Sequence, residues 1–147
     1  MVIDENLRVR LQFLSRVVER ESQLLLRTTK RLFVEPFSIE KAKQLESDDD
    51  LSEKVDAFVT RCSRLQGTLG DNLLPHLLLA LSERQSTQIY NLDIAERLGW
   101  ISSVDEWLAI RKLRNQMVHG YIEDLVVLYR FTYGSHVRCV WEKRHRG

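Results

Sequence analysis

The chain has 147 residues, 44% of them apolar, which is enough for one compact domain whose core needs neither disulfides nor metals. Its 22 basic and 21 acidic residues give a formal net charge of +1. The chain therefore lacks the overall excess of positive charge that would by itself indicate a nucleic-acid-binding protein. The two cysteines, Cys62 and Cys139, have no CxxC or Cys/His spacing, so they argue against a zinc site and are interpreted as small buried side chains in a reducing compartment.

The first predicted element is a long helix from Asp4 to about Phe33. Neither Gly nor Pro interrupts it, and its apolar residues recur at helical spacing, namely Leu7, Leu11, Leu14, Val18, Leu25 and Leu32. The N-terminus shows no basic segment, apolar stretch or cleavage site of a signal peptide, and no stretch of the chain approaches the roughly 20 apolar residues of a membrane span. We therefore expect a cytoplasmic protein that does not enter a membrane.

The next stretch, residues 34–50, is predicted to be a connection, with a short helical turn around residues 39–45 as an option within it. It holds Pro36 and the acidic run Asp48-Asp49-Asp50, and these carboxylates suit the positive end of a following helix.

A second helix is predicted from Leu51, with one apolar side formed by Val55, Phe58, Val59, Cys62, Leu65 and Leu69. Further along, Gly67, Gly70 and Pro75 are costly inside a helix, so the pattern predicts a kink or a break near Asp71. Asp71 would then be the N-cap of a restarted helix, with Pro75 just beyond its first turn.

Residues 82–88 are polar and are predicted to form a loop. Asn91 is predicted to cap a short helix over residues 92–98, which Gly99 ends in a left-handed conformation. Ser103, followed by two acidic residues, is predicted to start another helix, and Gly120 marks the end of that helix or a sharp bend.

The segment from Glu123 to Arg144 allows two interpretations. Its apolar residues fit a last helix that Gly134-Ser135 divides, whereas its β-branched and aromatic run also fits a hairpin; the helix is favoured because every preceding segment is helical. The predicted fold is all-α, an up-and-down bundle of four to five helices in a single domain that covers residues 1–147.

Residues 114–121 read Arg-Asn-Gln-Met-Val-His-Gly-Tyr and carry the main functional signal. They place the permanent charge of Arg114 five residues before the imidazole of His119, a group of the kind that can titrate near neutral pH, and the phenol of Tyr121 follows two residues later. Such groups suit phosphodiester cleavage. On a straight helix, however, Arg114 and His119 project about 140° apart. A swing of the arginine stem, a bend at Gly120 or a second copy of the motif across a two-fold axis are the three ways to complete the site.

Neighbouring residues of the same helix divide into two sides. Arg111, Asn115 and His119 follow one another by one turn each and form a stripe, so Asn115 is placed to orient the imidazole and Arg111 is a candidate RNA contact. The opposite side is interpreted as core packing and consists of Trp107, Ile110, Leu113 and Met117.

The spelling Arg-x-x-x-x-His-x-Tyr resembles the signature of the HEPN family (higher eukaryotes and prokaryotes nucleotide-binding), in particular the ribonuclease toxins that are paired with a nucleotidyltransferase antitoxin. The resemblance implies a HEPN-like homodimer in which the motifs of both subunits line one cleft. It assigns catalysis to Arg114 and His119, an orienting role to Asn115, and to Tyr121 the position that the antitoxin modifies by adding AMP.

The expected function is that of a toxin, a metal-independent endoribonuclease that needs no cofactor. His119 would remove the proton of a ribose 2′-hydroxyl, and Arg114 would neutralise the charge that grows on the phosphoryl oxygens. The chain has no Gly-rich phosphate loop, HExxH motif, serine nucleophile elbow or carboxylate cluster spaced for two metal ions. Two alternatives remain, a non-catalytic HEPN module that binds nucleotide or a nucleotidyltransferase, and a purely structural dimerising bundle.

Other basic residues carry weaker signals. His76 lies among leucines and is interpreted as a partly buried bundle residue, and the pair Arg130 and His136 lacks the Asn and Tyr of the motif. The run Lys143-Arg144-His145-Arg146 is typical of a solvated tail, with phosphate binding as the alternative.

Overall fold

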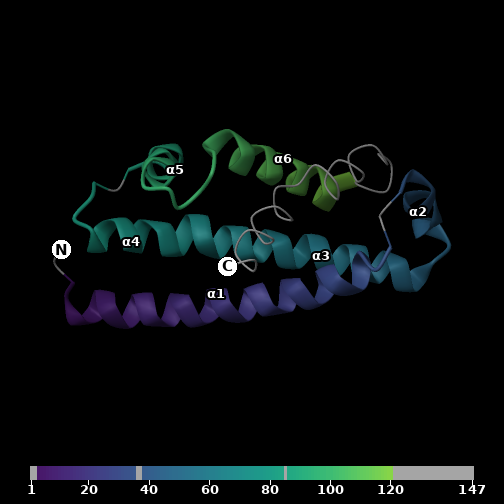
Figure 1. The fold of residues 1–147 in the computed structure, drawn as a ribbon, viewed down its shortest axis with the longest axis horizontal. Helices are drawn as coiled ribbons and strands as arrows, with labels where there is room; N and C mark the ends of the chain where they lie inside the picture. The colour runs from purple at the N-terminus through teal and green to yellow at the C-terminus, as the bar shows by residue number, and fades with distance from the viewer. Residues whose placement is uncertain (1–2, 36–37, 85, 121–147) are drawn as a thin grey trace. The chain divides into compact units, whose positions relative to one another are not determined.

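The computed structural model describes residues 3–35, 38–84 and 86–120, and every regular element within them is helical (Figure 1). The all-α class is therefore confirmed for this part of the chain, whereas the alternatives for the segment from Glu123 to Arg144 concern residues outside it. In chain order the elements are α1 (Glu5–Leu32), α2 (Ile39–Lys43), the 3₁₀ turn η1 (Gln44–Glu46), α3 (Asp49–Gly67), the π-helical segment η2 (Thr68–Leu73), α4 (Leu74–Ala80), α5 (Gln88–Arg97) and α6 (Val104–Gly120).

The helices form two compact units. The first contains the chain up to Leu24 together with Arg64–Asp105, and the second contains Leu25–Ser63 together with the chain from Glu106 onward.

In the second unit, the C-terminal part of α1 packs against α3. The rings of Phe33 and Phe58 meet edge to face, with centroids 5.5 Å apart and planes at 81°, and Arg61 of α3 donates a hydrogen bond to the Thr28 hydroxyl of α1. The most deeply buried side chains of this unit include Leu32 and Val55. Cys62 is buried as predicted.

In the first unit, the N-terminal half of α1 contributes buried Leu7 and Leu14, and α4 and α5 contribute Leu78 and Leu92, both fully buried. The start of α1 is capped by Asp4, whose Oδ1 accepts the Leu7 N–H at 2.7 Å. The first predicted helix is thus confirmed to within a residue at each end.

Of the kink or break predicted near Asp71, the break is wrong, because the chain continues through this point as a π-helix. The Leu74 N–H bonds to the Leu69 carbonyl, five residues back instead of four. Pro75 lies in the first turn of α4, immediately after this segment. Since Pro75 has no N–H to offer to a regular α-helix, the change of hydrogen-bond pattern coincides with the residue that disrupts that pattern. Asp71 is therefore not an N-cap. It lies within η2, where its Oδ1 accepts a hydrogen bond from the Gln88 amide at the start of α5.

The predicted cap of the next helix is also wrong. Helix α5 begins at Gln88, and its N-cap is Thr87, whose hydroxyl accepts the Tyr90 N–H at 3.2 Å. Asn91 lies inside the helix, is 4% exposed, and turns its Oδ1 back to accept the Ser86 N–H at 3.2 Å. Asparagine favours both kinds of contact, because its short amide reaches nearby backbone in caps and in loops alike.

Gly99 ends α5 as predicted. Its φ of +77° is left-handed, and the Trp100 N–H bonds to the Ala95 carbonyl at 2.9 Å, as in a Schellman motif. The optional helical turn in the first connection is also confirmed, as α2 and η1.

Candidate functional site

Helix α6 carries the motif, and the preceding helix fixes where it starts. Oε1 of Glu96, near the end of α5, accepts the Val104 N–H at 3.1 Å and so satisfies one of the free amides of the first turn of α6. Ser103 directly precedes this helix, as predicted. Further along α6, Ile110 is 8% exposed, which confirms its assignment to the core, and Trp107 is partly buried.

Helix α6 is helical from Val104 through Gly120, the last residue before the segment outside the structural description. Residues 114–119 all lie within this helix. For Arg114 and His119 the structure describes the backbone alone, and their positions differ by five residues, or about 140° around the helix axis. A single copy of α6 therefore does not bring these two positions onto one face. The bend considered at Gly120 would lie at the last residue that the structure describes.

Arg111 and Asn115 lie one turn apart on α6, and residue 119 follows one turn later. Arg111 is partly exposed and Asn115 is exposed, so this stripe reaches solvent at both residues. Their assigned roles, RNA contact and orientation of the imidazole, remain predictions. Tyr121, the predicted modification site, lies outside the described residues.

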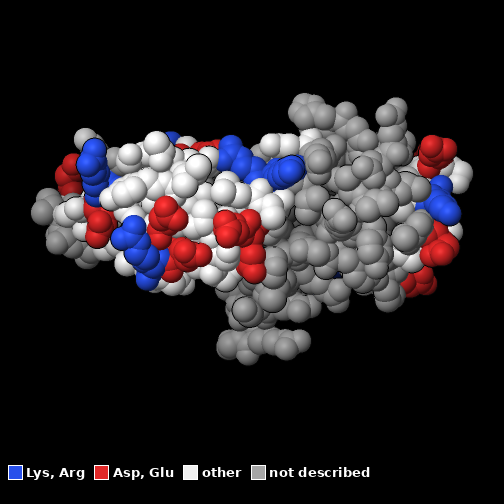
Figure 2. Space-filling view, turned by 90° about the horizontal axis from the view of Figure 1, so that it is seen from above, with Lys and Arg blue, Asp and Glu red and all other residues white. Residues whose placement is uncertain are grey.

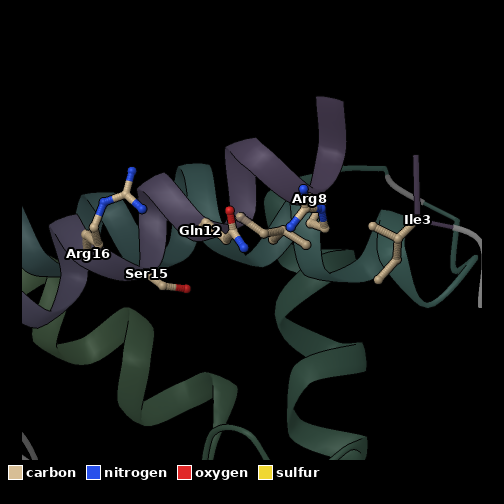
Figure 3. Close-up of a pocket in the computed structure, with 6 residues that line it drawn as sticks. Ile3, Arg8, Gln12, Ser15 and Arg16 are labelled. Atoms are coloured by element: carbon tan, nitrogen blue, oxygen red, sulfur yellow. The ribbon is translucent and has the colours of Figure 1, made fainter. Parts of the chain in front are cut away.

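A second candidate site, which the sequence reasoning missed, lies on the N-terminal half of α1. An open hollow of about 520 Å³ is lined by Ile3, Arg8, Leu11, Gln12, Ser15 and Arg16 (Figure 3). Arg8 forms an ion pair with Glu5, whereas Arg16 has neither a hydrogen bond nor an ion pair with any residue that the structure describes. The sequence signal was available, because α1 holds seven of the 22 basic residues of the chain but three of the 21 acidic ones.

Elsewhere the sign of the charge varies from place to place, and residues 46–56 hold six acidic side chains and one basic one. Figure 2 shows basic and acidic side chains interspersed over the described part of one face, in agreement with the near-zero net charge. His76 of α4 is partly buried, as predicted, and its Nδ1 lies 2.6 Å from the Asn72 carbonyl oxygen, one turn earlier in the chain.

Two classes of feature are absent from residues 3–35, 38–84 and 86–120. No group of three or more His, Cys, Asp or Glu side chains is arranged there to hold a metal ion. No helix there is both long and apolar enough to cross a membrane.

Comparison of the chain with protein-family models, with curated proteins and with solved structures finds no match.

Proposed function

We propose that this chain is a metal-independent endoribonuclease of the HEPN type that acts as the toxin of a toxin–antitoxin pair. The observation that carries the proposal is the motif Arg114-x-x-x-x-His119-x-Tyr121, together with the helix on which it stands. Residues 114 and 119 belong to the uninterrupted helix α6 of an all-helical protein, which is the context that the resemblance requires.

The proposed reaction is RNA transesterification. His119 removes the proton of a ribose 2′-hydroxyl, whose oxygen attacks the adjacent phosphorus while the bond from phosphorus to the 5′-oxygen breaks. The products are a 2′,3′-cyclic phosphate and a free 5′-hydroxyl. Arg114 stabilises the charge on the phosphoryl oxygens, a role that its planar guanidinium fills with two parallel hydrogen bonds. DNA lacks the 2′-hydroxyl and is not a substrate.

A homodimer is part of the proposal because of the geometry of α6. Positions about 140° apart on one helix do not face a common substrate, whereas two motif helices related by a two-fold axis can contribute to one cleft. His119 of the partner subunit would then protonate the leaving 5′-oxygen. Asn115, one turn before His119, orients the imidazole, and Arg111 contacts the RNA strand.

The second candidate function is a non-catalytic HEPN module that binds nucleotide or a nucleotidyltransferase. The mixed charge on the face shown in Figure 2 favours it, since a protein that binds RNA over a broad face usually presents an excess of positive charge. The two functions use the same residues and differ in whether RNA is cut.

The test is cleavage of single-stranded RNA in the presence of EDTA, with the products examined for a 2′,3′-cyclic phosphate. We expect His119→Ala and Arg114→Ala each to abolish cleavage while the helical circular-dichroism spectrum is kept. His76→Ala, which removes the other histidine among the described residues, should cleave like the wild type. Cleavage by the His119→Ala variant would contradict the mechanism. Purified protein that binds RNA without cutting it would support the binding module.

Tyr121 provides the link to the proposed antitoxin. Transfer of AMP to its phenol would place a phosphodiester two residues after His119, where it competes with substrate phosphate for Arg114. With ATP and the candidate nucleotidyltransferase, the wild type should gain the mass of AMP at Tyr121 and lose activity, whereas Tyr121→Phe should keep both its mass and most of its activity. Silencing of Tyr121→Phe without a gain of mass would show that the partner occludes the cleft instead.

A further inference from the structure

The solvent-facing side of α1 concentrates positive charge. From Arg8 to Arg20 the helix carries four arginines and one acidic residue, Glu19. Arg16 and Arg20 are exposed, and neither has a hydrogen bond or an ion pair with any described residue. Their guanidinium groups are therefore available to a ligand.

The hollow on α1 offers more than charge. Arg8, Gln12 and Arg16 follow one another at intervals of four residues, so they lie on one side of the helix, and Ser15 lies beside them (Figure 3). Together these side chains provide guanidinium, amide and hydroxyl donors along about two turns. Glu5 holds Arg8 by an ion pair, which positions that guanidinium at the cost of part of its charge.

An exposed aromatic ring adjoins this row of donors. Phe13 is 47% exposed and lies three residues before Arg16, hence on the neighbouring strip of the helix surface. The Arg10 guanidinium lies over the Phe13 ring, with its carbon 5.7 Å from the ring centroid. Val9, four residues before Phe13, is 52% exposed and extends the apolar strip.

We propose that this face of α1 binds single-stranded RNA, with Arg8, Gln12, Ser15 and Arg16 on the phosphates and Phe13 stacked on a base. An aromatic ring flanked by arginines is the combination that single-stranded nucleic acids need, because every base has a stacking face and every nucleotide a negative charge. The open shape of the hollow suits an extended strand better than an enclosed small molecule. The identity of the ligand rests on the proposed ribonuclease function, since this face would supply substrate-binding contacts in addition to those of the motif.

The experiment measures binding without cleavage. A fluorescent twelve-nucleotide 2′-O-methyl oligouridylate, whose blocked 2′-oxygens prevent transesterification, is titrated with the full chain and followed by anisotropy over a series of salt concentrations. For Arg16→Gln we expect weaker binding and a slope of log affinity against log salt that is shallower by about 0.7, the value for one phosphate contact on a single strand. For Phe13→Ala we expect a loss of roughly 5- to 150-fold with little change of slope, because stacking is not an ionic contact.

Two substitutions on α5 serve as matched controls. Arg97→Gln removes one exposed positive charge and Ile89→Ala removes one exposed apolar side chain, 58% exposed, from another helix of the same unit. Both should bind the oligonucleotide like the wild type. Circular dichroism of each variant verifies that the helices are intact.

The outcomes separate this inference from the proposed function. Equal affinity of Arg16→Gln, Phe13→Ala and the wild type overturns the α1 site even if the protein cleaves RNA. Binding that depends on these two residues supports the site even if no cleavage is found. Failure of the wild type to bind RNA, with binding instead to phosphatidylglycerol vesicles, would show that the arginines and Phe13 serve a lipid surface, and this also overturns the proposal.

Discussion

The Thr68 hydroxyl donates a hydrogen bond to Oε1 of Glu21 at 3.1 Å and thereby joins α1 to the first residue of the π segment. The same hydroxyl lies 3.1 Å from the Arg64 carbonyl, so its single proton is shared between two acceptors. The second carboxylate oxygen of Glu21 is buried and has no hydrogen-bond partner among the described residues. The Glu21 carboxylate thus accepts one shared hydrogen bond, although a carboxylate in a buried position needs several to offset its lost hydration.

Removing the charge at Glu21 should therefore cost little. We expect Glu21→Gln to unfold at a urea concentration equal to or above that of the wild type, since the amide keeps an oxygen for Thr68 and gives up a poorly solvated charge. Thr68→Val should lower the free energy of unfolding by about 1–3 kcal/mol, because it leaves Glu21 without its donor. In the Glu21→Gln background the same Thr68→Val substitution should cost less. A cost that is equal in both backgrounds would mean that the two side chains are not coupled.

At the start of α5, Thr87 is the N-cap and Asn91 lies inside the helix. Thr87→Ala removes the N-cap and should lower the free energy of unfolding by about 0.5–2 kcal/mol, whereas Thr87→Asn should restore most of this loss because asparagine also caps well. Asn91→Leu removes the acceptor of the Ser86 N–H from a position that is 4% exposed, so it should also lower the free energy of unfolding. Urea unfolding measures all three variants. A Thr87→Ala variant as stable as the wild type would be incompatible with the observed cap.

Two glycines should respond to alanine in opposite directions. Gly99 has a φ of +77°, so Gly99→Ala should destabilise the protein by roughly 1–2 kcal/mol although no atom lies within 4 Å of the new Cβ. Gly67 has a right-handed φ of −63°, and its new Cβ would come no closer than 4.0 Å to Asp71, so Gly67→Ala should stabilise it by roughly 0.5–1 kcal/mol. Thermal unfolding of the two variants side by side provides the comparison, and a shift of the same sign in both would contradict the assigned backbone conformations.

The ion pair at the start of α3 predicts a dependence of stability on pH. The Lys54 ammonium, hydrogen-bonded to Asp50 at 2.8 Å, lowers the pKa of that carboxyl. A lowered pKa in the folded state means that the pair contributes stability above the ordinary carboxyl pKa and loses it as the pH falls through the lowered value. Because Asp50 is exposed, the effect should be small. We expect Asp50→Asn to lower the urea midpoint slightly at neutral pH and not in strongly acidic solution. Glu53→Gln, on the same helix, is the control; a loss for Asp50→Asn that persists undiminished in acid would exclude the ion pair as its cause.

The long helices were predictable because the pattern of many residues indicates each of them. Six apolar residues at helical spacing placed α1 within a residue of its observed ends. Asp71 and Asn91 were misassigned because each decision depended on one side chain, whose partner, Gln88 or Ser86, is chosen by the surrounding structure. Glycine and proline near Asp71 correctly indicated an irregular helix. They could not distinguish a break from a π segment, since a break and a π segment each accommodate a residue without an N–H.

For the candidate sites the limits were different. The motif around Arg114 and His119 is readable from the sequence because a spacing of five residues needs no tertiary information. Helix geometry alone gives the separation of about 140° between the two positions on a straight helix. The row of donors on α1 escaped notice because the net charge of +1 averages a basic helix with an acidic remainder. Whether an arginine is engaged or available, as Arg8 and Arg16 are respectively, depends on rotamers and neighbours that composition does not encode.

The π segment also resets the phase of its helix. Gln66, Gly70, Leu74 and Leu78 are all buried and recur at every fourth residue, a spacing that overshoots a full α-helical turn by about 40° each time and would drift by roughly 120° over three steps. A π turn takes more than four residues, so within η2 the same spacing falls short of a turn and cancels much of the drift. Loss of one residue from Thr68–Leu73 would leave a more regular helix, yet it would rotate Leu74 and Leu78 by roughly 100° and carry them out of the interior that they now fill.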